Sequence, residues 1–389
     1  MKKKLLYLFL IPLCSLTMSA QSKSTTDIPE LLDKTPETYY EGTKGVNKLI
    51  FTRPANSSML SYKIYSSGQD PKQDPAAWKL KGSVDGKKWV VVDERKDQTF
   101  CSRFQEDIYT VQTPGEYTQY MFEMSAADKK STLVVGEIIL FEKDILADWK
   151  NFHYPNVEFN VLNPEVEGSK IYLKMVQNPD EYIKYHTQKV AEMIYWTDKD
   201  SILGIKKIQY DLKDQEGISA KGGGVPNINI FYSTRWVESK AKESPYVFDR
   251  ETRGVLYHEL THGYQYEPKN CGRYDGRSIF WSNIEGLADG VRIEARLFEN
   301  MGQNRLDTSK DKRKWMAGYR TTGYFLQWLK SKDPDALRKF NKSAADLPIW
   351  TWDNFTHYMF PRKYTGVHEL WDEYIEFINK PENKDKFDY

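Results

Sequence analysis

The sequence has few of the features that mark a disulfide-rich, nucleic-acid-binding or membrane-embedded protein. Only 3 of its 389 residues are cysteine, and the spacing of Cys101 and Cys271 indicates no bridge, so we expect two free thiols. The 56 Lys and Arg residues nearly balance the 55 Asp and Glu residues, and the formal net charge is +1. This balance gives no electrostatic case for nucleic acid or an anionic membrane as the main partner.

One apolar run is present, at the N-terminus. Lys2–Lys4 precede a largely apolar stretch from Leu5 to Leu16, and small residues end at Ala20. This is the layout of a secretory signal peptide, so we predict cleavage after Ala20 and export to the periplasm, the cell surface or the medium. The bulky Leu13 before Cys14 argues against lipid anchoring at that cysteine. No second run of roughly 18 apolar residues follows, so no transmembrane segment is expected.

Residues 26–143 have the pattern of an all-β domain. Short apolar or alternating runs such as Met59–Tyr65 and Leu133–Phe141 recur between turn signals such as Asp85-Gly86. Spaced strands of this kind indicate an antiparallel sandwich or barrel. Aromatic residues make up 14% of the chain, which fits half-buried strands or a surface that contacts carbohydrate or peptide.

Several motifs in this region resemble the discoidin, or coagulation factor 5/8 type C, family. They are LDKTPET at 32–38, DPAAW at 74–78, GSVDGKKW at 82–89, RFQ at 103–105 and GEIILF at 136–141. The resemblance implies a galactose-binding-like β-sandwich that binds a glycan or another surface ligand through loops at one end. A sandwich that serves only as a spacer is the alternative.

After a predicted linker at residues 144–169, the pattern changes to α+β. Residues 181–196 have the periodicity of an amphipathic helix, and strands are predicted at 207–212 and 228–233. From Asp249 onward the sequence pattern predicts mostly helices, and Asp249 is the expected N-cap of the first of them. We predict that strand 228–233 forms the edge of a substrate cleft and can pair with an extended peptide.

The segment VLYHELTH at 255–262 contains the strongest candidates for metal-binding and catalytic residues. His258 and His262 are four residues apart, so a helix places both imidazoles on one side, where they can bind one Zn²⁺ ion. Glu259 lies next to the first histidine and can act as the catalytic base that takes the proton of the attacking water. Two surface histidines beside an ordinary glutamate are the alternative, but apolar neighbours such as Leu256 argue against a solvated helix.

A hydrolytic zinc site needs a third protein ligand and one open position. Glu285 is the predicted third ligand, and Asp289 is expected to accept the distal N–H of one histidine. Ser282 with Glu285 also has the pattern of a capping box, in which Glu285 would serve only the start of a helix. Asp275 is the rival ligand, and Pro268 stands where a metzincin would have its third histidine.

A further donor should stabilise the oxyanion that develops during hydrolysis. Tyr319 and His357 are the candidates, although each could equally be an ordinary core or surface residue. Arg292 and Arg296 are expected to pair with carboxylates on their own helix.

Four segments resemble the basic secretory protein family of plant and bacterial peptidases. They lie at 254–265, 284–292, 318–329 and 365–374, and include the histidine motif and the sequence IEGLADGVR around Glu285. The resemblance implies a gluzincin-like zinc metallopeptidase. The chain departs from the family's name in one respect, because it is nearly neutral rather than basic.

These features together predict a multidomain exported enzyme. Its parts are a signal peptide at 1–20, an all-β galactose-binding-like sandwich at 26–143, the linker, and an α+β zincin-like metallopeptidase domain at 170–380. The expected substrate is a polypeptide or glycoprotein, and the sandwich is expected to hold it by binding its glycan. A non-catalytic glycan-binding adhesin and a zinc amidase acting on a non-protein amide are the alternatives.

Overall fold

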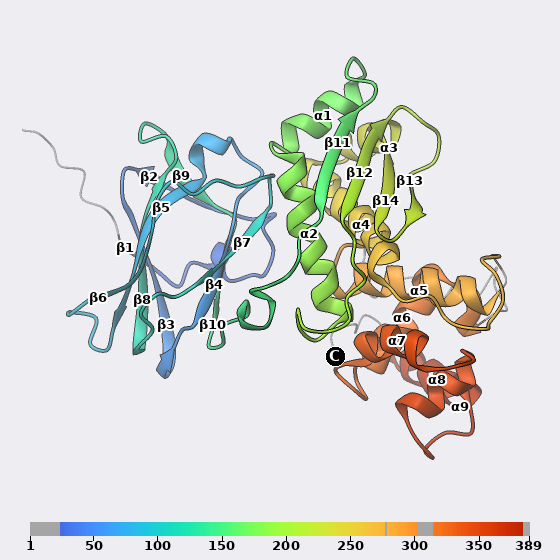
Figure 1. The fold of residues 1–389 in the computed structure, drawn as a ribbon. Helices are drawn as coiled ribbons and strands as arrows, with labels where there is room; N and C mark the ends of the chain where they lie inside the picture. The colour runs from blue at the N-terminus through green and yellow to red at the C-terminus, as the bar shows by residue number, and fades with distance from the viewer. Residues whose placement is uncertain (1–23, 277, 300, 302–313, 384–389) are drawn as a thin grey trace, which may run out of the picture.

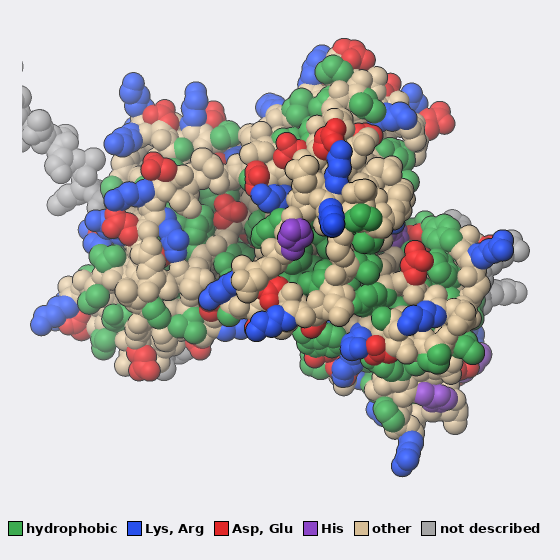
Figure 2. All heavy atoms as spheres, viewed as in Figure 1, with side chains coloured by type: hydrophobic (Ala, Val, Ile, Leu, Met, Phe, Trp, Pro, Cys, Tyr) green, Lys and Arg blue, Asp and Glu red, His purple; other side chains and the backbone are tan. Residues whose placement is uncertain are grey.

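The computed structural model describes residues 24–276, 278–299, 301 and 314–383, which form two domains packed side by side (Figure 1). The signal peptide predicted at 1–20, with Cys14, lies outside the described residues. In the described part of the chain, no helix combines the length and the apolar character that a membrane crossing requires. Basic and acidic side chains are interspersed over the face shown in Figure 2.

The N-terminal domain is a sandwich of two main sheets, which confirms the all-β prediction. The larger sheet has the order β1 (Ser24–Thr26), β3 (Asn47–Ser58), β8 (Glu116–Ala126), β5 (Pro75–Ser83) and β6 (Val90–Arg95). The smaller has the order β10 (Glu137–Phe141), β4 (Ser61–Tyr65) and β7 (Glu106–Thr110). A separate ladder joins β2 (Tyr40–Lys44) to β9 (Thr132–Val135). Only β1 and β3 pair in parallel among these described strands.

Aromatic side chains from both sheets fill the core of the sandwich. The rings of Tyr62, Trp78, Tyr109 and Phe122 contact one another with centroid separations between 5.0 and 6.4 Å. The Tyr62 hydroxyl accepts a hydrogen bond from the Trp78 indole N–H at 2.8 Å and donates one to the buried Asp93. The polar ends of these rings are therefore paired inside the core, as buried polar groups require. Much of the aromatic content of this domain is thus structural.

The C-terminal domain is a mixed α/β unit built on one four-stranded sheet. Its order is β11 (Asn156–Val161), β12 (Lys207–Lys213), β14 (Asn227–Ser233) and β13 (Ser219–Gly224). The first three are parallel, and β13 pairs antiparallel with β14 at the edge. The prediction that strand 228–233 is the cleft edge is wrong, because β14 has a partner on each side and β13 is the outer strand.

Helices pack beside and behind this sheet and gather below it in the view of Figure 1, and they form most of the remainder of the domain. They are α1 (Glu167–Met175), α2 (Pro179–Ile194), α3 (Thr234–Ala241), α4 (Pro245–Tyr264), α5 (Ile279–Glu294), α6 (Tyr319–Leu329), α7 (Ala336–Asp346), α8 (Trp352–Met359) and α9 (Val367–Asn379). The predicted linker at 144–169 is too long, because β11 and the first turn of α1 lie within it. The polar residues of β11, which is only partly buried, hid its alternation.

Helix α4, which carries the histidine motif, is longer than the sequence indicated. It begins at Pro245, where the Ser244 hydroxyl accepts a hydrogen bond from the Val247 N–H at 3.0 Å. Asp249 is therefore not the N-cap; it lies inside the helix and pairs with Arg253 one turn later. The helix buries one face in the domain core, and this anchors the opposite face that bears the histidines.

The two domains are joined by backbone hydrogen bonds as well as by the chain. The Arg103 N–H donates to the Met175 carbonyl at 2.9 Å, and the Asn178 N–H donates to the Cys101 carbonyl at 3.0 Å. A sandwich loop thus pairs with the junction between α1 and α2. Cys101 and Cys271 are both free thiols, as expected.

A buried carboxylate strengthens this interface. Glu106 in β7 lies 3.0 Å from the Lys63 ammonium and accepts hydrogen bonds from Tyr65 and, at 3.3 Å, from Tyr185 of α2. Burial alone raises the pKa of Glu106, but the charges of Lys63 and Lys189 and the hydrogen bond from Tyr65 outweigh it and hold the pKa at about 2. Glu106 is therefore ionised at neutral pH and links the sandwich to α2.

Candidate metal centre

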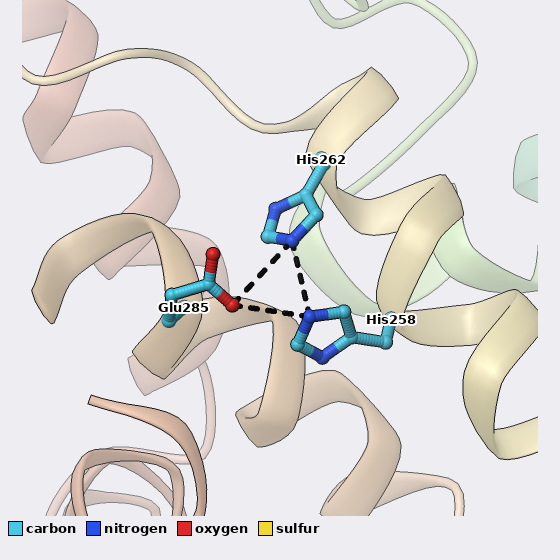
Figure 3. Close-up of side chains that lie close together, drawn as sticks. All are labelled: His258, His262 and Glu285. Carbon is cyan, nitrogen blue, oxygen red and sulfur yellow. Dashed lines mark hydrogen bonds and ion pairs between the residues drawn. The ribbon is translucent and has the colours of Figure 1, made fainter. Parts of the chain in front are cut away.

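Three predicted metal ligands from two helices meet at one point. His258 and His262 project from α4, and Glu285 projects from α5 (Figure 3). His258 Nε2 lies 3.1 Å from both His262 Nε2 and Glu285 Oε2, and His262 Nε2 lies 3.7 Å from the same oxygen. Within the described residues, this is the one set of three or more His, Cys, Asp or Glu side chains whose ligand atoms all lie within 4.8 Å of one another. Asp275 is not part of that set.

The start of α5 decides between the two interpretations of Glu285. The helix begins at Ile279, and the hydroxyl of Ser278 caps it by accepting a hydrogen bond from the Trp281 N–H at 3.0 Å. Ser282 lies inside the first turn, and its hydroxyl donates to the Ile279 carbonyl at 2.9 Å. The capping-box alternative is therefore wrong, and Glu285 faces the histidines instead of the helix start.

The far nitrogen of each imidazole is also held. His258 Nδ1 lies 2.8 Å from Asp289 Oδ1, so Nδ1 carries the proton that Asp289 accepts. His262 Nδ1 lies 2.9 Å from the amide nitrogen of Gln265, whose buried Oε1 has no hydrogen-bond partner. With the amide turned by 180°, Oε1 takes this position and accepts the Nδ1 proton. When both imidazoles are neutral, their Nε2 atoms then present lone pairs. Two lone pairs and a carboxylate oxygen repel one another unless a cation lies among them, so the donor set fits a metal ion.

The electrostatics of the cluster favour positive charge. Burial alone lowers the pKa of His258, but hydrogen bonds with Asp289 and Glu285 outweigh it and raise the pKa to about 10. Burial alone raises the pKa of Glu285, but hydrogen bonds with the two histidines hold it well below the usual range. The carboxylates therefore attract a cation to this point, either a proton or a metal ion.

Glu259 and Tyr319 lie beside the ligands. Glu259 is only 6% exposed and lies near enough to His258 for its charge to contribute to the raised pKa of that histidine. The Tyr319 ring stacks on the His258 imidazole, with centroids 5.9 Å apart and planes 18° apart. Burial and the charge of Glu285 raise the pKa of Tyr319 to about 12, so its phenol stays protonated at neutral pH. The other oxyanion candidate, His357, instead contacts the Thr365 carbonyl at 3.2 Å.

An unusual backbone places the Tyr319 ring. Gly318 has a φ of +70°, and the Trp281 ring occupies the space where a Cβ would stand, with its nearest carbon 2.4 Å from that position. Tyr319 itself has a φ of +40°, which is rare for a residue with a side chain. A positive φ costs free energy in a residue with a side chain, and residues of this kind concentrate at functional sites.

The glycine at the start of the histidine motif lets α4 and α5 approach each other. A Cβ on Gly254 would lie 2.4 Å from Nε of Arg292. The Arg292 guanidinium crosses this space and pairs with Glu251 of α4 at 2.6 Å. The prediction that Arg292 pairs within its own helix is wrong, because the partner comes from the helix packed against it. This contact fixes the spacing between the helix of the histidines and the helix of Glu285.

Two histidines and a glutamate from packed helices, with a second glutamate beside them, define a candidate metal-dependent hydrolase. The family model for a peptidase of plants and bacteria (BSP) matches residues 154–374, which is more than half of the chain. The chain therefore belongs to this peptidase family.

Other comparisons cover shorter parts. The chain is 36% identical over 88 residues to the peptide-N(4)-(N-acetyl-β-glucosaminyl)asparagine amidase of Arabidopsis thaliana, a match that covers 21% of this chain and 12% of the plant protein. A family 32 carbohydrate-binding module from Streptococcus pneumoniae EndoD is 9% identical with a TM-score of 0.24, covering 27% of this chain and 75% of that one. An F5/8 type C domain from Bacteroides fragilis is 12% identical with a TM-score of 0.27, covering 30% and 81%. These TM-scores add nothing about what the sandwich binds.

Proposed function

We propose that the protein is an exported zinc-dependent peptidase that acts on glycan-bearing polypeptides. The convergence of His258 Nε2, His262 Nε2 and Glu285 Oε2 carries the proposal. Tetrahedral zinc with bonds of about 2.0–2.1 Å places its donor atoms about 3.3–3.4 Å apart. The three separations, 3.1, 3.1 and 3.7 Å, lie on either side of that value.

The residues around this point have separate tasks. Zinc bound there would polarise the scissile carbonyl and acidify a water molecule. Glu259 takes the proton of the attacking water and passes it to the leaving amine. Asp289 keeps the His258 proton on Nδ1, so that Nε2 remains a ligand. Tyr319 donates a hydrogen bond to the oxyanion that develops on the carbonyl.

Glycan binding and export are further parts of the proposal. The F5/8 type C motifs in the sandwich support a glycan ligand, which would hold a glycoprotein near the active site and raise its effective concentration. The N-terminal motif that ends at Ala20 supports export.

Hydrolysis of matched peptides tests the proposal. The substrates are a glycopeptide and the same peptide without its glycan, each incubated with the intact mature chain as purified, after chelation, and after zinc is restored. We expect chelation to abolish cleavage and zinc to restore it, and the glycan to lower KM by roughly tenfold or more. Mass spectrometry of the products should show new peptide termini.

The same experiment separates the alternatives. An adhesin would bind the glycopeptide and give no product. An amidase would release the glycan and convert the glycosylated asparagine to aspartate with the peptide bonds intact. Cleavage that survives chelation would refute zinc dependence, and equal KM values for the two peptides would refute the role of the glycan.

A further inference from the structure

Glu285 has a partner on each of its carboxylate oxygens. Oε2 faces the two histidine Nε2 atoms, and Oε1 accepts a hydrogen bond from the phenol of Tyr274. Asp289 and Gln265 hold the two histidines in the same way, each from the side away from the metal point. Each ligand side chain therefore has one group that sets its orientation.

Packing does not explain the position of Tyr274. The residue lies in the segment between α4 and α5 and is 59% exposed. Its hydroxyl group donates a hydrogen bond to Glu285, and the Trp281 indole lies close enough to the phenol to influence its pKa. The Trp281 ring also meets the Tyr319 ring edge-on, with centroids 5.4 Å apart. Tyr274 is thus tied to the site through its hydroxyl group, while much of its ring faces solvent.

A carboxylate can bind a metal ion through one oxygen or through both. A donor on Oε1 uses the oxygen that two-oxygen binding would need, and it fixes the direction in which Oε2 points. Without that donor, the carboxylate is free to rotate and to occupy a second coordination position. Hydrolysis needs that position for water.

We propose that Tyr274 is a positioning residue of the metal centre, which holds Glu285 so that it binds through Oε2 alone and leaves one position open. The inference rests on the proposed function, because it assigns to Glu285 the role of a metal ligand. Nothing in the sequence marked this residue.

Tyr274→Phe tests the inference, because it removes the hydroxyl and keeps the ring. Tyr358→Phe is the matched control, since the Tyr358 hydroxyl donates to a carboxylate oxygen of Asp346 at 2.9 Å, away from the ligand set. For each protein, the Zn²⁺ dissociation constant is measured by competition with a chromogenic chelator. The visible absorption spectrum of the Co²⁺-substituted protein reports the coordination number.

We expect Tyr274→Phe to raise the Zn²⁺ dissociation constant by roughly ten- to a hundredfold. Its Co²⁺ absorption should weaken, because binding through both oxygens raises the coordination number. The control should match the wild type in both measurements. The melting temperature of the metal-free protein should be the same for all three proteins.

The possible failures are distinct. If the wild type binds zinc and Tyr274→Phe matches it in affinity and Co²⁺ spectrum, the inference is wrong and the proposed function stands. Slower turnover with unchanged affinity and spectrum would also overturn it, because the phenol would then act on the substrate. A wild-type protein that binds no zinc would overturn both the inference and the proposed function.

Discussion

Glu259→Gln is expected to lower kcat for peptide hydrolysis by about 10²- to 10⁴-fold, the usual contribution of a general acid–base group. Glutamine has nearly the same shape, but its amide cannot take the proton of the attacking water. Glu259 is not in the set of converging ligands, so zinc content and affinity should not change. Steady-state kinetics and elemental analysis of the same preparations measure both quantities.

Glu267→Gln is the control for this substitution, because Glu267 is exposed and lies just beyond the end of α4. Its kcat should equal that of the wild type. Activity of Glu259→Gln within a few-fold of the wild type would show that Glu259 is not the base. Loss of zinc from Glu259→Gln would show instead that Glu259 is itself a ligand.

Arg103→Ala is expected to destabilise the protein by about 3–5 kcal/mol, because it leaves a buried carboxylate without its partner. Arg103 is 3% exposed and Asp74 is 5% exposed, and the guanidinium contacts both carboxylate oxygens, one at 2.7 Å. Burial already raises the pKa of Asp74 above its ordinary value despite Arg103. Denaturant unfolding measures the loss.

Arg53→Ala provides the comparison within the same domain. Arg53 pairs with Glu142 at 2.6 Å, but the Glu142 side chain is 59% exposed, and exposed pairs contribute only about 0–1 kcal/mol. Equal losses of stability in the two variants would contradict the account of the buried pair. The Arg103 side chain also donates to the Gln177 side chain, between α1 and α2, at 3.4 Å, so its loss should also loosen the contact between the domains.

The role of the sandwich in substrate binding should be tested on the intact chain, because deleting the sandwich would also disturb the helix that bears the histidines. Tyr185 contacts Glu106 of the sandwich, and the next residue of α2, His186, lies 3.2 Å from the Tyr257 hydroxyl on α4. Tyr257 immediately precedes the proposed metal ligand His258 in sequence. Removing the sandwich would therefore expose the support of α4 as well as removing the domain that we propose binds the glycan.

Local spacing was enough to predict the central part of the site. The interval between His258 and His262 implies one helix face, and the structure places both on α4. Glu285 and Asp289 follow the same logic on a second helix, although only the packing of α4 against α5 brings Glu285 to the histidines. That packing depends on Gly254 and Arg292, whose contact is not visible in the spacing of either helix.

The contacts that the sequence did not predict depend on tertiary structure. Tyr274 is one of 26 tyrosines, and nothing in its neighbours indicates that its hydroxyl group reaches Glu285. Strand order in a sheet likewise follows from the path of the chain, so the alternation of β14 could not reveal that β13 lies outside it. The role of Gln265 becomes visible only when its amide is seen beside His262.

Anomalous X-ray scattering at the zinc edge, from crystals of the zinc-loaded protein, tests the central claim most directly. The account predicts one strong peak about 2.0–2.2 Å from His258 Nε2, His262 Nε2 and one oxygen of Glu285. A peak that excludes Glu285, or no peak between the histidines at saturating zinc, would contradict it.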